Sequence, residues 1–148
     1  MKTVFLLFNV LLGVQILVGQ QDVIFLSGNG YSYSISTQTQ KNEWGSKDTL
    51  VKMYRLENGV KKYLLTHYLY RYASDCNNTF TDIGTIEYFK DRIIFKTQYL
   101  QKGSDPIPEA QQQIYNIDDR GRLLLVSDKL YMKGKWVNTD DIMKIAPY

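Results

Sequence analysis

The chain of 148 residues contains one cysteine, one histidine and three prolines. A single cysteine, Cys76, excludes an internal disulfide, so the stability of the fold has to come from its core. We expect Cys76 to be a small buried side chain, with an intermolecular bridge as the alternative. A single histidine, His67, excludes a histidine-based metal cluster. It lies within an expected strand, whereas catalytic groups usually sit on loops or strand ends, so we expect it to be structural.

Sequence signatures of catalysis are also missing. The chain has no Gly-x-Ser-x-Gly elbow, no phosphate loop and no dinucleotide fingerprint. Residues 75–79 and Asp82 are rich in oxygen ligands, but Phe80 and Ile86 stand where a calcium loop needs glycine and glutamate. Their side chains are better suited to capping a turn. We therefore predict a protein that is not an enzyme, with no cofactor and no metal site.

The first 19 residues predict a secretory signal peptide. Lys2 supplies a positive start, and residues 4–14 form a nearly unbroken apolar stretch. That stretch is too short to span a bilayer, which needs about 20 apolar residues. Cleavage after Gly19 or Gln20 would leave a single domain, residues 20–148, in the periplasm or outside the cell. The basic residues are scattered singly among acids, so nucleic acid is not an expected partner.

Twelve tyrosines and recurrent alternation of apolar and polar residues are typical of an all-β protein. The strongest local signal is Asn58-Gly59, which favours the type I′ turn of a β-hairpin between strands at 50–56 and 60–72. Loops are expected at 38–47, 73–79 and 102–108. The other strands are expected at 22–26, 31–35, 81–89, 93–99, 112–117, 122–127 and 130–137.

Sequential hairpins of this number close most simply as an antiparallel up-and-down barrel, which leaves no exposed edge. We predict such a barrel over residues 22–137, with a two-sheet β-sandwich as the alternative.

The segment from Asp75 to Leu125 resembles small bacterial secreted lipocalin-like domains of the calycin type. The shared features are Asp75-Cys76, Thr79-Phe80, Gly84-Thr85-Ile86, Arg92-Ile93-Ile94-Phe95 and a late hairpin with Gly121 before Arg122-Leu123-Leu124-Leu125. The Gly-x-Trp opening of lipocalins is not matched, because Asn42 stands two residues before Trp44. The resemblance implies a β-barrel, and it transfers no ligand and no functional residue.

Aromatic side chains are the candidate ligand-binding residues. Tyrosine packs its ring against apolar groups and keeps a polar tip, which suits an amphiphilic ligand. Three candidates share one face of the expected strand 60–72, and three others join them if the hairpins pair as expected. The six are Tyr68, Tyr70, Tyr72, Tyr88, Tyr99 and Trp44. The alternative role for each of them is to fill the core.

The leading functional hypothesis is non-catalytic binding of a small apolar or amphiphilic ligand by a periplasmic or secreted protein. One alternative is a protein-interaction or envelope-assembly module with a filled core and an exposed apolar patch. Another is a carbohydrate-binding module with coplanar aromatics on an outer sheet face. An enzyme would need polar side chains converging in a cleft, and His67 and Asp75 are its only starting points.

Overall fold

The computed structural model describes residues 22–74, 78–103 and 108–141. Within these ranges most residues belong to β-strands, which confirms the predicted all-β class. None of these residues forms a helix long and apolar enough to cross a membrane. The strands are β1 (Asp22–Leu26), β2 (Ser32–Lys41), β3 (Lys47–Glu57), β4 (Val60–Ser74), β5 (Thr79–Tyr88), β6 (Arg92–Lys102), β7 (Ala110–Ile117), β8 (Leu123–Met132) and β9 (Lys135–Asn138).

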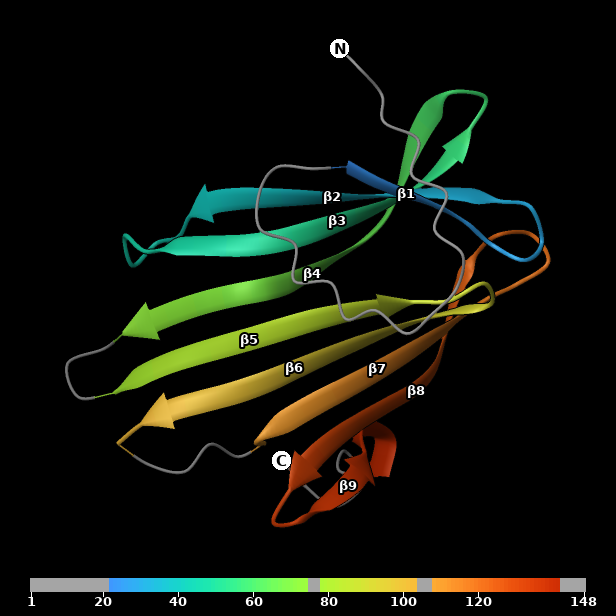
Figure 1. The fold of residues 1–148 in the computed structure, drawn as a ribbon. Helices are drawn as coiled ribbons and strands as arrows, with labels where there is room; N and C mark the ends of the chain where they lie inside the picture. The colour runs from blue at the N-terminus through green and yellow to red at the C-terminus, as the bar shows by residue number, and fades with distance from the viewer. Residues whose placement is uncertain (1–21, 75–77, 104–107, 142–148) are drawn as a thin grey trace.

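All nine strands belong to one antiparallel sheet, in which each strand pairs with the next along the chain (Figure 1). This is the predicted up-and-down order. The predicted closure over residues 22–137 is not observed, because the described strands β1 and β9 lie at opposite edges and do not pair. A two-sheet sandwich is not observed either, since every strand shares the same sheet. The architecture is an open meander.

The strand boundaries differ from the prediction at several places. β2 continues through Lys41 into the expected loop 38–47, because its polar end pairs with the start of β3. β5 begins at Thr79, inside the expected loop 73–79. The expected strand 130–137 is divided by a turn at Lys133-Gly134, where φ is +50° and +80°. Positive φ at both central residues is the type I′ pattern, so this tight hairpin repeats the one at Asn58-Gly59.

β4 is the strand at which the sheet bends over. It pairs with β3 along residues 60–70, but it pairs with β5 only along residues 70–74. Two register shifts interrupt the β3–β4 pairing, beside Leu50 and beside Tyr54. Such bulges bend a strand and increase its twist. The early strands therefore turn away from β5 and lie opposite the later strands (Figure 1).

Gly84 on β5 lies directly against this bend. A Cβ atom on Gly84 would come within 1.9 Å of the carbonyl oxygen of Tyr68 and within 2.9 Å of the Nε2 atom of His67. The first distance is far shorter than a van der Waals contact, and the obstructing atom belongs to the backbone. A residue with a side chain at this position would therefore push β4 and β5 apart.

The core lies between the two halves of the bent sheet. Phe25 stacks on Tyr33 and on Tyr88, with ring centroids 5.1 Å and 4.9 Å apart. His67 packs on Phe95 with ring centroids 4.5 Å apart. The buried cluster draws on both halves and consists of Tyr33, Ile35, Val51, Met53, Ile86, Ile93 and Phe95. These side chains pack against one another across the bend, so the open sheet still has a single hydrophobic core.

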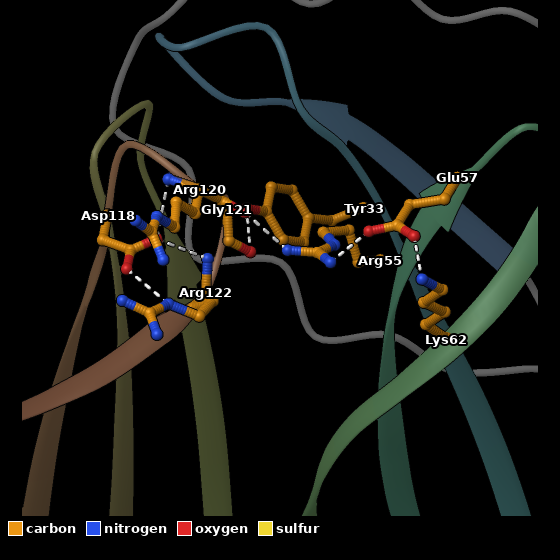
Figure 2. A network of polar contacts seen from close by, with 8 residues as sticks. All are labelled: Tyr33, Arg55, Glu57, Lys62, Asp118, Arg120, Gly121 and Arg122. Atoms are coloured by element: carbon orange, nitrogen blue, oxygen red, sulfur yellow. Dashed lines mark hydrogen bonds and ion pairs between the residues drawn. The ribbon is translucent and has the colours of Figure 1, made fainter.

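One end of the bent sheet is closed by the turn between β7 and β8, residues 118–122. Tyr33 is fully buried, and its hydroxyl donates to the carbonyl oxygen of Gly121 at 2.9 Å. Arg55 on β3 donates from Nη1 to the carbonyl oxygen of Arg120 at 2.6 Å. Figure 2 shows both contacts reaching across from the early strands to this turn. We call this pair of contacts, made by Tyr33 and Arg55, the clamp.

The clamp acts on a turn that is already held rigid. The Asp118 carboxylate accepts hydrogen bonds from the backbone N–H groups of Arg120 and Arg122, at 3.0 Å and 2.7 Å, and from the Arg122 guanidinium. These hydrogen bonds lower the pKa of Asp118, and the bond from the Arg122 backbone N–H makes the largest contribution. Asn29 adds a 2.6 Å hydrogen bond to the Asp118 carbonyl oxygen. On the other side, Glu57 pairs with Arg55 and with Lys62 (Figure 2).

We predict that Gly84→Ala lowers the free energy of unfolding by about 2 kcal/mol or more, because the new methyl group collides with the Tyr68 backbone. Urea unfolding measures the effect. Gly28→Ala is the matched control, since a Cβ there meets only Lys90, at the ordinary contact distance of 3.6 Å. Equal stability of the two variants would show that β4 does not cross β5 this closely.

Candidate functional site

The end of the sheet opposite the clamp holds an open hollow with a volume of about 630 Å³. It lies where β2, β4 and β6 end and where β3 and β5 begin, so five consecutive strands contribute to its wall. Its lining combines aromatic side chains with amides and charged groups. The lining residues are Gln40, Lys41, Asn42, Glu43, Trp44, Asp48, Tyr68, Arg71, Tyr72, Ala73, Phe80, Asp82 and Tyr99.

Four of the six aromatic residues selected from the sequence line this hollow: Trp44, Tyr68, Tyr72 and Tyr99. They come from the β2–β3 turn, from β4 and from β6, so only the fold brings them together. Tyr88 lies elsewhere, in the core, where it stacks on Phe25.

Tyr70 does not line the hollow, although it shares the parity of Tyr68 and Tyr72. Its side chain is 41% exposed, and across the strands it is paired with Ile83, which is equally exposed. A bulge lies between Tyr68 and Tyr70: Leu50 pairs with Tyr68, but the adjacent Thr49 pairs with Tyr70. β4 thus carries one residue more than β3 at this point, and the simple alternation of faces is interrupted.

Asn42 shapes the turn that carries Trp44. Its side-chain oxygen accepts hydrogen bonds from the backbone N–H groups of Trp44 and Ser46, at 3.1 Å and 3.0 Å. Its side-chain nitrogen donates to the buried Asp48 carboxylate at 2.9 Å and to the Tyr72 carbonyl oxygen at 2.8 Å. One amide therefore ties the turn both to β3 and to the end of β4.

Arg71 and Asp82 form an ion pair in the wall of the hollow. Two guanidinium nitrogens, Nε and Nη2, lie 2.8 Å and 2.6 Å from the same oxygen, Oδ2 of Asp82. The guanidinium carbon of Arg71 also lies 5.2 Å from the ring centroid of Tyr68. Arg71 is thereby held between a carboxylate and an aromatic face, which favours a fixed position for an otherwise flexible side chain.

A row of linked polar groups leads away from the hollow along β6, β7 and β8. The Tyr99 hydroxyl donates to Oε1 of Gln111 at 2.8 Å, and Nε2 of Gln111 donates to Asp128 at 2.8 Å. Gln113 donates to the other oxygen of Asp128 at 3.2 Å. Desolvation raises the pKa of Tyr99, with a further contribution from Asp82, so its hydroxyl remains a neutral donor at physiological pH.

His67 sits near the bend but not in the hollow. Burial lowers its pKa to about 4, against the opposing effect of a hydrogen bond that the imidazole donates to the Lys96 backbone. Its Nε2 atom lies close to Gly84 and has no hydrogen-bond partner among the described residues. A neutral imidazole packed on Phe95 suits a structural role.

Within the described ranges, no group of three or more His, Cys, Asp or Glu side chains is placed to hold a metal ion. Asp75 and Cys76 lie outside the described residues, as does the predicted signal peptide, residues 1–19.

Sequence reasoning missed several groups that matter in the hollow, namely Asn42, Arg71, Phe80 and Asp82 as neighbours of the tyrosines. Polar residues at strand ends are usually solvated, so their residue types alone carry no signal. Chemically, the hollow offers aromatic faces, hydrogen-bond donors and acceptors, and charged groups, of which Arg71 and Asp82 form an ion pair. That combination is suited to holding a ligand.

No protein-family model, no curated protein and no solved structure matches this chain. The lipocalin-like resemblance of residues 75–125 therefore stays a prediction.

We predict that the protein loses stability as the pH falls from 7 to 5, by about 2 kcal/mol on account of His67. The folded state keeps this imidazole neutral down to about pH 4, whereas the unfolded chain binds a proton near pH 6.5. The stability that the neutral His67 side chain contributes is therefore fully present above pH 6.5, and it is lost as the pH falls toward 4. Urea unfolding at the two pH values measures this loss. In the His67→Leu variant, the free energy of unfolding should change less between pH 7 and pH 5. An unchanged pH dependence in that variant would show that His67 is not the group responsible.

We predict that Asn42→Ala lowers the free energy of unfolding by about 1–3 kcal/mol, because the buried Asp48 carboxylate and the Tyr72 carbonyl both lose a donor. Asn138→Ala is the control, since that exposed side chain makes one 3.2 Å hydrogen bond, to Asp141. It should change stability by less than about 0.5 kcal/mol. Chemical denaturation compares the two, and similar losses would mean that Asn42 does not organise the turn.

Proposed function

We propose that the protein binds a small amphiphilic ligand, without catalysis, in the hollow at the open end of the sheet. Trp44, Tyr68, Tyr72 and Tyr99 supply the apolar contacts, and Arg71 and Asp82 orient polar groups of the ligand. The observation that carries this proposal is that four aromatic side chains, from three segments of the chain, line one hollow of about 630 Å³. That volume lies within the range of small-molecule sites.

The position of the hollow differs from that of a ligand inside a barrel. Tyr33, Ile35 and Phe95 pack in the space between the two halves of the sheet. The proposed ligand therefore lies at the end of the strands, beside the β2–β3 turn. The proposal does not depend on the lipocalin-like resemblance or on the predicted export of the protein, which both stay predictions.

A protein-interaction module is the second candidate, and it is favoured by one feature of β8. Leu124, Leu125 and Val126 are consecutive, and each is about half exposed. β9 pairs only with residues 129–132 of β8, so among the described strands this apolar stretch has a partner on one side alone. An exposed apolar edge of this kind is a common site of strand pairing with another chain.

Nile red, a neutral amphiphilic dye, tests the proposed site. We expect Trp44→Ala to weaken dye binding by about tenfold, the effect of losing roughly 1.4 kcal/mol of aromatic contact. Trp44 is 55% exposed, so its truncation should leave the fold intact. Fluorescence titration measures the affinity, and circular dichroism checks folding.

Trp136→Ala is the matched control, because Trp136 is 48% exposed and lies on β9, away from the hollow. Its dye affinity should stay within about twofold of the wild-type value. Equal affinities in the two tryptophan variants would overturn the proposed site and favour the surface of β8 as the functional region.

A further inference from the structure

We infer that the ligand of the hollow is a neutral saccharide. This inference rests on the proposed function and adds the chemical class of the ligand. A sugar ring presents apolar C–H groups on its faces and hydroxyl groups around its rim. It therefore needs aromatic surfaces and hydrogen-bonding side chains close together, and the hollow supplies both kinds of group.

The lining of the hollow argues against an acyl chain. Among the described residues, the lining contains five aromatic side chains and seven polar or charged ones, and its only aliphatic residue is Ala73. Fatty acids and other lipids are held in enclosed cavities lined by branched aliphatic side chains. In this protein such side chains, among them Ile35, Val51 and Ile86, are used in the core instead.

The charges of the hollow argue against an anionic ligand. Its strongest cation, Arg71, is already paired with Asp82 through two guanidinium nitrogens. Lys41 is accompanied by Glu43 and by Asp48 in the same lining. The described side chains of the lining thus carry three carboxylates and two cations, so among them there is no surplus of positive charge for a phosphate or a carboxylate.

The same groups argue against a quaternary ammonium ligand. An aromatic cage attracts a cation through the faces of its rings. Here the guanidinium of Arg71 lies 5.2 Å from the ring centroid of Tyr68, so the chain itself occupies that cation–π position. A second cation beside Tyr68 would be repelled by Arg71.

A neutral polyhydroxyl ligand remains, and it suits the remaining polar groups. Each sugar hydroxyl both donates and accepts hydrogen bonds, so it can meet a carboxylate such as Asp82 and an amide or phenol with equal ease. The hydroxyl of Tyr99 stays protonated, because desolvation raises its pKa. The hollow is open to solvent, which leaves room for a longer saccharide to extend beyond it.

Tryptophan fluorescence gives a direct readout of this site. The chain has two tryptophans, Trp44 and Trp136, so in the Trp136→Phe variant all indole emission comes from Trp44. We expect soluble fragments of cellulose, chitin or starch to shift or quench this emission in a saturable way, for at least one of the three. Palmitate, inorganic phosphate and choline should leave it unchanged.

A second measurement links the effect to the hollow. Tyr72→Ala should weaken binding of the active saccharide by about tenfold or more, whereas Tyr70→Ala should leave it within about twofold, because Tyr70 lies outside the hollow. The wild-type melting temperature should rise with that saccharide, since a ligand that binds only the folded state stabilises it. Affinity electrophoresis gives an independent comparison of the two tyrosine variants.

The outcomes separate the two proposals. Binding of Nile red that depends on Trp44, without any saccharide response, would overturn the saccharide class and leave the proposed function standing. A response of the Trp44 emission to palmitate, phosphate or choline, without a response to any saccharide, would also overturn the saccharide class and leave the proposed function standing. If neither dye nor saccharide binding depends on Trp44, both proposals fail.

Discussion

The clamp between the early strands and the β7–β8 turn is the contact on which the rest of the structure depends. Tyr33 is fully buried, and a buried hydroxyl without a partner would cost about 1–3 kcal/mol. The carbonyl oxygen of Gly121 provides that partner. Gly121 can approach because it has no side chain: a Cβ there would come 2.6 Å from the Tyr31 ring, and its φ of +69° favours glycine as well. Gly121 thus meets two requirements: it has no side chain to collide with the Tyr31 ring, and it adopts a positive φ without strain.

The clamp and the bend of β4 together explain how an open sheet protects a core. The bulges of β4 and the close approach at Gly84 turn the early strands over the later ones. The clamp then holds the two halves together at one end. At the opposite end, the described ends of five strands and the β2–β3 turn line the hollow. The candidate site therefore lies at the end of the sheet opposite the clamp.

Ordering of the hollow follows a similar principle, in which single side chains hold several backbone groups. Asn42 binds two N–H groups of its own turn and one carbonyl of β4. Arg71 is fixed by Asp82 on one side and by the Tyr68 ring on the other. Side chains restrained in this way lose less conformational freedom when a ligand binds, which favours affinity.

The amino-acid sequence by itself determined the all-β class, the sequential hairpin order and most strand centres. Those features depend on local signals, such as the alternation around Tyr33 and Ile35 and the Asn58-Gly59 turn, whose positive φ values the structure shows. Local signals were weaker at strand ends. The polar end of β2 and the Lys133-Gly134 turn were missed, because pairing with a neighbouring strand decides their conformation.

Only the tertiary structure decided that the sheet stays open and where its functional groups meet. Closure depends on whether the two edge strands can reach each other, and no periodicity encodes that distance. The sequence singled out Trp44, Tyr68, Tyr72 and Tyr99 by their type, but their shared hollow results from the bend of β4. The bulge between Tyr68 and Tyr70 arises from a mismatch of one residue between β3 and β4. Such a mismatch is a property of two strands in contact, and it cannot be read from either strand alone.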